Sequence, residues 1–426
     1  MALYNINKII SIIPLSKLSS ILDFLSRNPI WNYFINKNQK KSLGKLKKLD
    51  SVLIIADLNI GDAVLVQPFI EGIKYYFPKI SISFVYTKRA KSIIENNPNL
   101  TKNYPIFQGS YNPKDSDYAN IKKLIAQNHY DLIINFCPSF NKKNLSYSEQ
   151  NMLSPVKLAN KIISTYKNPN KKSHLKHHLI EYLNSIILDL PKNIGSQKKL
   201  YTKKTTQLFL KKSDFLEGDK YLESIGIDKN SNIVFFNPDA SSKYTFINKD
   251  LQIELITKII ASPKIDHLIL GSGFKFKNIE KELIASVPKQ FKSKIKILPK
   301  TLLISIFTAI LDRCNIVITG DTAPLHIASA RKKISNPKNK NTICINKTKV
   351  TGIFGASPDK IYGYDSTSKE HIPSSQDASS KIFKSNPNCK SMLCILYKVN
   401  NACEGKNCFK GLDLNQIIHY INNENI

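Results

Sequence analysis

The stretch Ile316–Ala330, with the sequence IVITGDTAPLHIASA, decides the fold of this chain. Its first residues are apolar and β-branched, which predicts a buried strand, and Gly320 marks a tight turn after it. Asp321 and Thr322 are N-cap candidates, and Pro324 suits the first helical turn because it has no N–H to leave unsatisfied there. The stretch therefore predicts a strand, a turn and a helix, the repeating unit of an open α/β sheet.

The first turn of the expected helix presents unpaired backbone N–H groups and a partial positive charge at the carboxyl end of the strand. In open α/β sheets, anionic ligands bind at this edge. An ordinary capped helix contains the same residues. The stretch alone therefore predicts a βα unit without separating a binding site from a structural element.

Strands and helices alternate twice along the chain, which predicts two successive α/β domains with parallel sheets. In the first set, an apolar strand precedes a helix that Pro78 stops, and a second strand follows at once. The second set begins at Asn232 and ends with the strand of the opening stretch. The expected strands are 51–58, 80–86, 131–136, 233–237, 267–271, 295–298 and 316–319. The further expected helices are 90–96, 179–188, 251–261, 279–285 and 303–312.

We expect an α/β fold of the GT-B type, in which two Rossmann-like, doubly wound domains face a central cleft. Residues 1–48 are expected to form a helical, basic extension, which either lies on a membrane surface or packs on the first domain. Residues 49–212 and 213–411 form the two Rossmann-like domains, and residues 412–426 contain a helix that returns to the first of them. Neither domain has a G-x-G-x-x-G or P-loop motif, which argues against a dinucleotide dehydrogenase or a P-loop enzyme.

The chain is strongly basic. Its 426 residues include 63 Lys and Arg but only 32 Asp and Glu, which gives a formal net charge of +31. This charge favours a polyanionic partner, such as an anionic membrane face or a phosphorylated glycolipid, although a compositional bias towards Lys, Asn and Ile gives the same excess. Nucleic acid is not expected, because its readers favour Arg and aromatic platforms and the excess is nearly all Lys. No membrane-spanning run and no signal-peptide pattern is present, so we expect a cytoplasmic location, at most peripheral on the inner membrane face.

Two further loops follow expected strands at positions where a ligand can bind. In the first, residues 59–62 (NIGD), Gly61 permits a sharp turn and the Asp62 carboxylate lies near a helix N-terminus. This carboxylate can act as a general base towards a hydroxyl, or it can simply cap its helix. In the second loop, residues 237–243 (NPDASSK), the point charge of Lys243 suits a phosphate group. The small polar residues just before that lysine are Ser241 and Ser242.

Together, the three segments resemble glycosyltransferase family 9, the ADP-heptose:lipopolysaccharide heptosyltransferases. The family begins with an apolar strand and an I-G-D turn, matched by residues 60–62. Its second domain opens with an N-P-G-A-S-like turn and a lysine, matched by residues 237–241 and by Lys243. Its D-T-G-P-[LM]-H-[LI]-A-x-A signature is matched by residues 321–330. The resemblance covers roughly residues 51–420 in order, and the D-T-x-P-x-H-x-A motif is fairly specific.

The resemblance implies an inverting, metal-independent transfer that needs no cofactor for catalysis. A heptose would move from a nucleotide-diphosphate donor, ADP-heptose, to a phosphorylated glycolipid acceptor such as the lipopolysaccharide core or lipid A–Kdo. The N-terminal domain would bind the acceptor and the C-terminal domain the donor. Asp62, held by the Gly61 turn, would deprotonate the acceptor hydroxyl, because the acceptor side needs a carboxylate.

The resemblance also implies a donor site built from the other two segments. Lys243 and the backbone amides of Thr322 and Ala323 would hold the leaving diphosphate, which needs positive charge and N–H donors. Asp321 would repel the diphosphate, so we assign it to capping the helix or fixing the turn. His326, one turn into that helix, would contact the donor or form a buried structural hydrogen bond.

The sequence departs from the family's pattern at several positions, among them the following. Ala323 replaces a glycine, and a positive φ at that position would cost on the order of 1 kcal/mol. Asp239 replaces another glycine and adds a negative charge near the expected phosphate site. Residues 331–349 are longer and more basic than the family's connection, and they form either a loop near the acceptor entrance or a solvated insertion. Two alternatives therefore stay open: a GT-B enzyme with a protein acceptor or nucleotide-sugar epimerase activity, and a catalytically degenerate basic binding protein.

Four of the seven cysteines gather near the C-terminus in the pattern Cys389-x4-Cys394-x8-Cys403-x4-Cys408. Four thiolates can bind a structural zinc or iron ion. The x4 spacings are looser than the common C-x2-C arrangement, so reduced thiols or a disulfide pair are the alternatives. The other three lie in apolar contexts and are expected to be reduced core residues: Cys137, Cys314 and Cys344.

Overall fold

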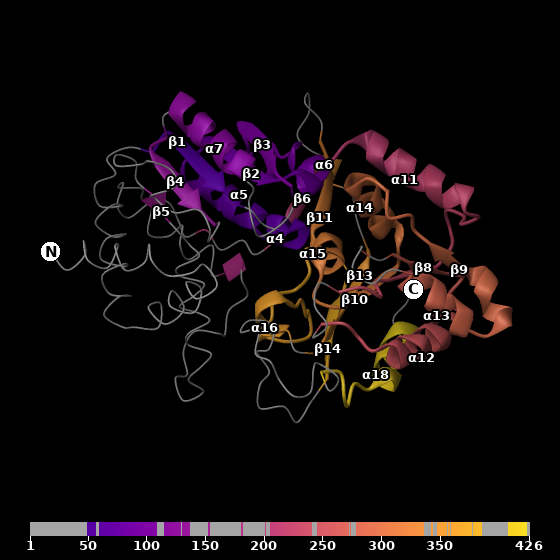
Figure 1. The fold of residues 1–426 in the computed structure, drawn as a ribbon. Helices are drawn as coiled ribbons and strands as arrows, with labels where there is room; N and C mark the ends of the chain where they lie inside the picture. Colours follow the sequence, from indigo (N-terminus) through magenta and orange to yellow (C-terminus); the bar gives the residue numbers. More distant parts are fainter. Residues whose placement is uncertain are drawn as a thin grey trace, which may run out of the picture.

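The fold comes from a computed structural model, in which two α/β domains are coloured from indigo to magenta and from pink to yellow (Figure 1). The expected extension, residues 1–48, lies outside the described residues, as does most of the expected helix at 179–188. The described residues are 49–56, 59–108, 115–128, 130–136, 152–153, 180–181, 201, 205–240, 245–271, 273, 278–335, 342–343, 347–355, 357, 359–376, 378–385 and 408–423.

The N-terminal domain is built on a sheet of parallel strands. The strands are β1 (Ser51–Ile55), β2 (Ser81–Thr87), β3 (Lys102–Phe107), β4 (Leu132–Asn135) and β5 (Met152–Leu153). The helices are α4 (Ile60–Leu65), α5 (Gln67–Tyr76), η1 (Lys88–Ala90), α6 (Lys91–Ile94) and α7 (Asp115–Gln127). The strand order is β3-β2-β1-β4-β5, and the central strands β1 and β4 are buried, as their apolar sequences predict. The helix expected after β1 is divided at Val66 into α4 and α5.

The C-terminal domain contains a six-stranded parallel sheet. Its strands are β7 (Ile233–Phe236), β8 (His267–Leu270), β9 (Ile295–Ile297), β10 (Ile316–Thr319), β13 (Lys349–Phe354) and β14 (Ser380–Lys384). Its helices are α11 (Lys212–Ser224), α12 (Lys249–Ile260), α13 (Ile279–Ser286), η2 (Lys289–Lys294), α14 (Ile304–Arg313), α15 (Ala323–Ser329), α16 (Asp359–Tyr362) and α18 (Leu414–Asn423). The order β9-β8-β7-β10-β13-β14 is the Rossmann order. The strands and helices expected between residues 233 and 319 are all confirmed.

A third sheet corrects two expectations from the sequence. It joins three short strands: β6 (Gln207–Leu210), β11 (Arg331–Ile334) and β12 (Thr342–Ile343). β6, which we expected to belong to the N-terminal domain, pairs in parallel with β11 of the C-terminal domain. The expectation of a loop or solvated insertion is wrong for β11, because Lys332 is fully buried and its Nζ lies 2.9 Å from Oδ1 of Asp312.

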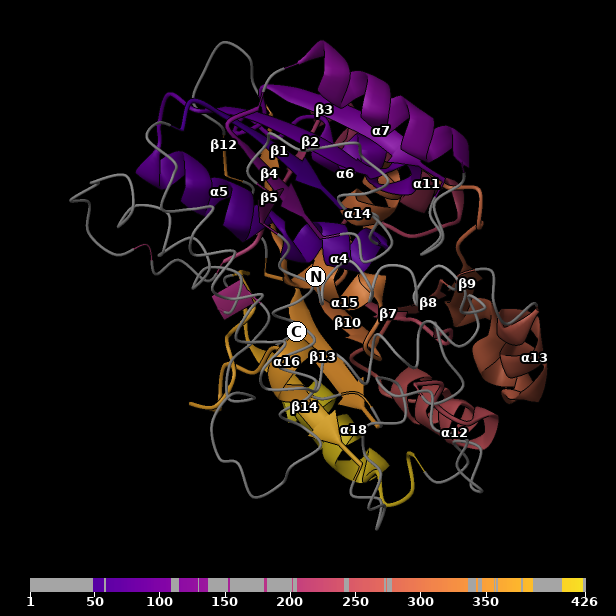
Figure 2. The same cartoon turned by 60° about the vertical axis from the view of Figure 1, so that its left-hand side comes forward.

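Helix α18 packs on α12 in the C-terminal domain, contrary to the expected return to the N-terminal domain (Figures 1 and 2). Its apolar stripe, Leu414, Ile417 and Ile421, is buried in the core of the C-terminal domain. Polar contacts fix the two ends of the helix: Lys258 Nζ donates to Asn415 Oδ1 (2.7 Å), and Ser262 Oγ donates to Asn422 Oδ1 (2.8 Å).

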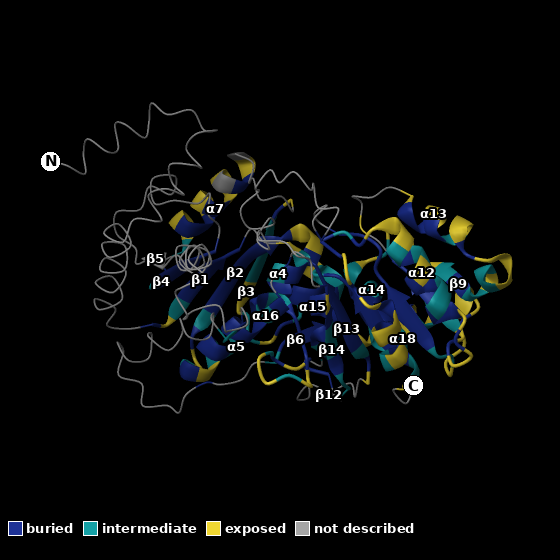
Figure 3. Cartoon of the chain, turned by 90° about the horizontal axis from the view of Figure 1, so that it is seen from below, coloured by how far each residue is buried: buried dark blue, intermediate teal, exposed yellow. Residues whose placement is uncertain are grey.

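One hydrophobic cluster extends from the N-terminal domain into the C-terminal domain, so that buried residues continue across both (Figure 3). It includes Val64 of α4, Ile93 of α6 and Ile327 of α15. The domains are therefore joined through packed apolar side chains in addition to the chain itself. Among the helices that the structure describes, none has the length and apolar character needed to cross a bilayer.

Candidate active site

The three segments singled out from the sequence lie at the topological switch points of the two large sheets. In the N-terminal sheet, β1 stands between β2 and β4, and the Gly61–Asp62 turn follows its carboxyl end. In the C-terminal sheet, β7 and β10 are neighbours; Asn237 follows the first and Thr322 follows the second. Open α/β sheets bind ligands in the crevice outside such points. The topology therefore agrees with a ligand site formed by these segments.

The Asn237 side chain ties the loop after β7 to the loop after β10. Its Nδ2 lies within hydrogen-bonding distance of Thr322 Oγ1 (2.9 Å), the backbone oxygen of Asp239 (3.0 Å) and Thr319 Oγ1 (3.2 Å). The hydroxyls of Thr319 and Thr322 are also 2.8 Å apart. Because these groups are largely buried, the network holds the two loops as one polar unit.

The start of α15 differs in one respect from the expected capped helix. Thr322 occupies the N-cap position with extended backbone angles, but its side chain makes no capping hydrogen bond because the hydroxyl faces Asn237 and Thr319. Pro324 lies in the first turn, as predicted. Ala323 begins the helix, and among the described non-glycine residues only Asn278 has a positive φ, so the backbone strain considered for Ala323 does not arise.

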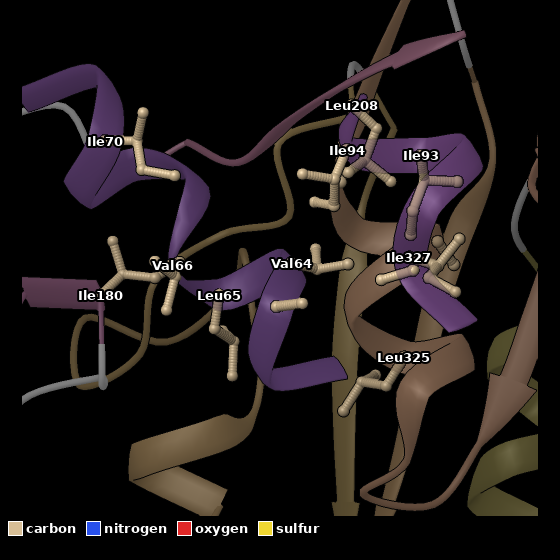
Figure 4. Packing of buried hydrophobic residues seen from close by; sticks show 14 of the residues in the cluster. Val64, Leu65, Val66, Ile70, Ile93, Ile94, Ile180, Leu208, Leu325 and Ile327 are labelled. Carbon is tan, nitrogen blue, oxygen red and sulfur yellow. The ribbon is translucent and has the colours of Figure 1, made fainter. Parts of the chain in front are cut away.

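Gly61 lies directly against α15. A Cβ atom at Gly61 would be 2.9 Å from Cδ2 of His326 and 3.3 Å from Cα of Ala323. Figure 4 shows buried side chains of α4, α6 and α15 in one cluster, among them Val64, Ile93 and Ile327. The absence of a side chain at Gly61 is thus what permits α4 to approach the start of α15.

Asp62 follows Gly61 in the first turn of α4 and is half-buried. The N-cap position of α4 is held by Asn59, not by Asp62. An acidic residue in the first turn is favourable to the helix dipole, so this position also stabilises a carboxylate. The contact of Gly61 with α15 anchors the backbone that carries the Asp62 side chain.

His326 lies buried between two other polar residues of the C-terminal domain. Its Nδ1 is 3.1 Å from Oη of Tyr364, and its Nε2 is 3.7 Å from Oδ1 of Asp321. Burial, followed by the charge of Asp321, raises the pKa of the Tyr364 phenol above its usual value. His326 therefore makes the buried hydrogen bond that was one of its two expected roles.

Asp239 is buried and points towards the loop that follows β8. Its Oδ1 accepts a hydrogen bond from the backbone N–H of Ala240 (2.7 Å), and its Oδ2 would lie 2.9 Å from a Cβ at Gly273. The carboxylate is thus engaged by the backbone of its own turn. The negative charge of Asp239, which replaces a glycine of the family's pattern, therefore lies beside the loop that follows β8.

Comparison with known proteins matches a family model to the central part of the chain. The sequence model described as glycosyltransferase family 9 (heptosyltransferase) matches residues 157–335. The chain carries a glycosyltransferase family 9 domain. It is accordingly a glycosyltransferase, with the GT-B fold. A search of curated proteins finds no match to the sequence.

Several solved structures share the fold of this chain. A family 9 glycosyltransferase from Veillonella parvula superposes with a TM-score of 0.59 and 14% identity, over 87% of this chain and 96% of that one. The ADP-heptose lipopolysaccharide heptosyltransferase II of Escherichia coli gives a TM-score of 0.53 and 12% identity, over 87% and 99%. The E. coli heptosyltransferase WaaC with ADP gives 0.52 and 14%, over 87% and 98%. At these identities, the likeness concerns the fold.

Several predicted site residues lie outside the described part of the chain: Ser241, Ser242, Lys243, Cys389, Cys394 and Cys403. Cys408 is described, and it is buried. Cys314 is also buried and reduced, as expected, whereas Cys137 and Cys344 lie outside the described residues. Within the described residues, no three His, Cys, Asp or Glu side chains gather as metal ligands would.

Two features of the site were not predicted from the sequence: Tyr364 and the linking role of Asn237. Tyr364 lies in a polar segment after α16 with no helical or strand periodicity, so no pattern marks it. It forms an isolated parallel bridge with Ile372. The N-P dipeptide at Asn237 marked a turn, but its hydrogen bonds to the loop after β10 depend on strand order.

Replacing Gly61 with Ala should destabilise the protein by about 1–3 kcal/mol, because the added methyl overlaps the His326 ring and approaches the backbone of α15. In a His326→Ala background, the ring no longer obstructs the methyl. The loss in the double variant should therefore be smaller than the sum of the two single losses by roughly 0.5–3 kcal/mol. Urea denaturation of the four proteins measures this coupling.

Gly320→Ala provides the matched control for that cycle. A Cβ at Gly320 would make only ordinary contacts, the nearest at 3.5 Å from the backbone oxygen of Thr245. This variant should stay within about 0.5 kcal/mol of the wild type. Strictly additive losses for Gly61→Ala and His326→Ala would show that Gly61 does not rest on the His326 ring in solution.

Proposed function

We propose that the protein is an inverting glycosyltransferase that moves a heptose from a nucleotide-diphosphate donor, ADP-heptose, to a lipopolysaccharide core or lipid A–Kdo acceptor. The observation that carries this proposal is the contact of the Gly61–Asp62 turn with the start of α15. Through this contact, the turn that carries Asp62 lies against the helix that begins directly after Thr322, whose hydroxyl is bound by Asn237. Two similar structures add support: the E. coli heptosyltransferase WaaC with ADP, and the same enzyme with ADP-2-deoxy-2-fluoro heptose.

In the proposed reaction, the acceptor hydroxyl attacks the anomeric carbon of the heptose from the face opposite the diphosphate. The bond from that carbon to the diphosphate oxygen breaks, so the configuration inverts. Asp62 takes the proton of the hydroxyl as general base. Lys243 and the amides of Thr322 and Ala323 stabilise the charge that develops on the leaving diphosphate. No metal or other cofactor takes part in these steps.

The function is tested by incubating the purified protein with a panel of nucleotide sugars and with lipopolysaccharide-core acceptors of increasing length. Mass spectrometry of the products should show one heptose added to the core and release of ADP. Thermal shift should give the largest stabilisation with ADP-heptose, since a ligand that binds only the folded state raises the melting temperature. Transfer from another nucleotide sugar with none from ADP-heptose would refute the donor.

The same experiment separates the alternatives. Heptose transfer to a protein, with none to the glycolipid, would change the acceptor class. Conversion of the nucleotide sugar without any acceptor would indicate an epimerase. Binding of polyanionic vesicles without affinity for any nucleotide would indicate a degenerate binding protein. The +31 charge fits a peripheral position on an anionic membrane face, and flotation with anionic vesicles tests that placement.

Replacement of Lys243 by Ala should weaken ADP binding by roughly 10- to 100-fold, the loss expected for one charge-assisted hydrogen bond to a phosphate. Isothermal titration calorimetry with ADP measures the change. Lys249→Ala is the control, because Lys249 begins α12 and is engaged with Glu282 at 2.8 Å. Equal ADP affinities in Lys243→Ala and the wild type would remove Lys243 from the donor site.

A structural zinc or iron ion bound by the four C-terminal cysteines is proposed separately from catalysis. Cys408 lies where its backbone oxygen accepts a hydrogen bond from Ser385. The other three cysteines lie outside the described residues. Metal analysis of the purified protein should find close to one ion per chain, and its absence would favour reduced thiols or a disulfide pair.

A further inference from the structure

Asp321, His326 and Tyr364 form a line of polar groups that crosses the start of α15. The His326 ring is in the middle, with Oη of Tyr364 at 3.1 Å from Nδ1 and Oδ1 of Asp321 at 3.7 Å from Nε2. His326 and Tyr364 are buried, and the ring centroids are 5.9 Å apart in an edge-to-face arrangement. The line therefore comes from two separate segments, the start of α15 and the segment after α16.

The charges of this line select one tautomer of His326. The negative carboxylate of Asp321 favours an N–H at the nearer nitrogen, Nε2, and Nδ1 then has a free lone pair. Tyr364 remains protonated because burial and the charge of Asp321 both raise the pKa of its phenol. Its O–H can therefore donate to Nδ1, which fixes both the tautomer and the orientation of the ring.

The edge of the His326 ring supports the Gly61–Asp62 turn. Cδ2 is the ring atom that a Cβ at Gly61 would approach to 2.9 Å. Cδ2 is bonded to Nε2, so a rotation of the ring would displace the surface on which Gly61 rests. The orientation of this ring is thus coupled to the backbone position of the residue before Asp62.

The segment that carries Tyr364 is itself well anchored. Asp365, the next residue, accepts hydrogen bonds at Oδ1 from the backbone N–H of Thr367 (2.8 Å) and at Oδ2 from that of Ile382 in β14 (3.2 Å). The Tyr364 hydroxyl is therefore presented to His326 from a segment held on the edge strand of the C-terminal sheet. This anchoring favours a fixed hydrogen bond over a transient one.

We propose that Tyr364 is a positioning residue, whose hydroxyl fixes the His326 ring and thereby the Gly61–Asp62 turn that the ring supports. The role rests on the proposed function in one respect only, namely that Asp62 is the base. Tyr364 itself touches neither reactant in this proposal. It acts through His326 and Gly61.

The test is Tyr364→Phe, which keeps the ring and removes only the hydroxyl. We expect kcat for heptose transfer to fall by roughly 10- to 100-fold, because a small displacement of the base impairs the attack geometry. The donor KM should stay within about twofold, because the turn lies on the acceptor side. Tyr420→Phe is the control. Tyr420 lies on α18, and its hydroxyl is 2.9 Å from Oγ of Ser379. This variant also removes a tyrosine hydrogen bond, but kcat should be unchanged.

The tautomer of His326 is measured independently of transfer, by NMR of protein labelled with ¹⁵N-histidine and with the signal assigned from His326→Ala. The wild type should show the proton on Nε2, and Tyr364→Phe should show a mixture of tautomers or a protonated ring. If the wild type transfers no heptose, the proposed function fails, whereas the NMR result still decides the link between Tyr364 and His326. An unchanged tautomer and an unchanged kcat in Tyr364→Phe would overturn the positioning role.

A double-variant cycle distinguishes an effect transmitted through His326 from a loss of activity caused by unfolding. In a His326→Ala background, Tyr364→Phe should have no further effect on kcat, because the residue acts only through the imidazole. If Tyr364→Phe lowered kcat by the same factor in both backgrounds, Tyr364 would act by another route. Melting temperatures of all variants, Tyr420→Phe included, identify any protein whose loss of activity reflects unfolding.

Discussion

The Asp62→Asn variant is expected to transfer sugar about 10²- to 10⁴-fold more slowly than the wild type, the contribution usual for a general base. The amide has the shape of the carboxylate but cannot accept the proton of the acceptor hydroxyl. Because Asn59 holds the N-cap position of α4, the exchange should leave the helix in place. Steady-state kinetics with ADP-heptose and a core acceptor measure kcat, and calorimetry with ADP should show unchanged donor affinity.

Asp219→Asn supplies a matched control for that experiment. Asp219 lies on α11 and is 3.6 Å from Arg313, so the same chemical change is made far from the contact between α4 and α15. An ion pair between two half-exposed side chains contributes little, and kcat should be unchanged. Full activity of Asp62→Asn would contradict the base assignment, and a loss of ADP affinity would indicate that Asp62 acts on the donor side.

The elements of the C-terminal domain could be predicted closely because apolar strands alternate with amphipathic helices between residues 233 and 319. Elsewhere the local signal was weaker. β3 contains Lys102, Asn103 and Pro105, a composition that does not indicate a strand, and it was missed. It lies at the edge of its sheet, where a proline can be accommodated. The residues of β11 were expected in a loop, since a run of basic residues normally indicates a solvated segment.

The candidate site was predictable as separate loops, but not as an assembly. Small and polar residues after apolar strands predicted that Asp62, Asn237 and Thr322 lie just beyond the ends of strands, and the structure confirms these positions. Their relation depends on strand order and on the packing between domains, which no local pattern contains. Gly61 was predicted to permit a sharp turn, whereas in the structure its lack of a side chain permits close packing against His326. The partner that completes the His326 environment, Tyr364, lies 38 residues further along the chain.

Lys332→Met is expected to lower the free energy of unfolding by about 3–5 kcal/mol, which is the loss typical when one member of a buried ion pair is removed. Lys332 is fully buried, and its Nζ lies 2.9 Å from Asp312 Oδ1 and 3.2 Å from the backbone oxygen of Ala328. Its removal leaves the Asp312 carboxylate buried without that cation. Urea denaturation measures the loss, and Lys333→Met, at the half-buried next position of β11, should stay within about 0.5 kcal/mol of the wild type.

The loss in Lys332→Met should depend on pH in a defined direction. Burial raises the pKa of the Asp312 carboxyl, and the Lys332 ammonium opposes that rise, so the variant should have a still higher pKa. A raised folded-state pKa means that the folded variant binds the proton more tightly than the unfolded chain does. The loss should therefore be smallest below the unfolded pKa near 3.8 and grow as the pH rises through the folded pKa.

A second substitution distinguishes an unpaired charge from a packing defect. In Lys332→Met/Asp312→Leu, both charges are replaced by apolar side chains, and most of the lost stability should return, because such exchanges of a buried pair are often neutral or stabilising. The pH dependence should disappear with the carboxyl. A double variant as unstable as Lys332→Met would mean that the ammonium acts mainly on the backbone oxygen of Ala328. Lys332 also donates a hydrogen bond to the backbone oxygen of Ala328, near the end of α15. The start of that helix belongs to the proposed donor site.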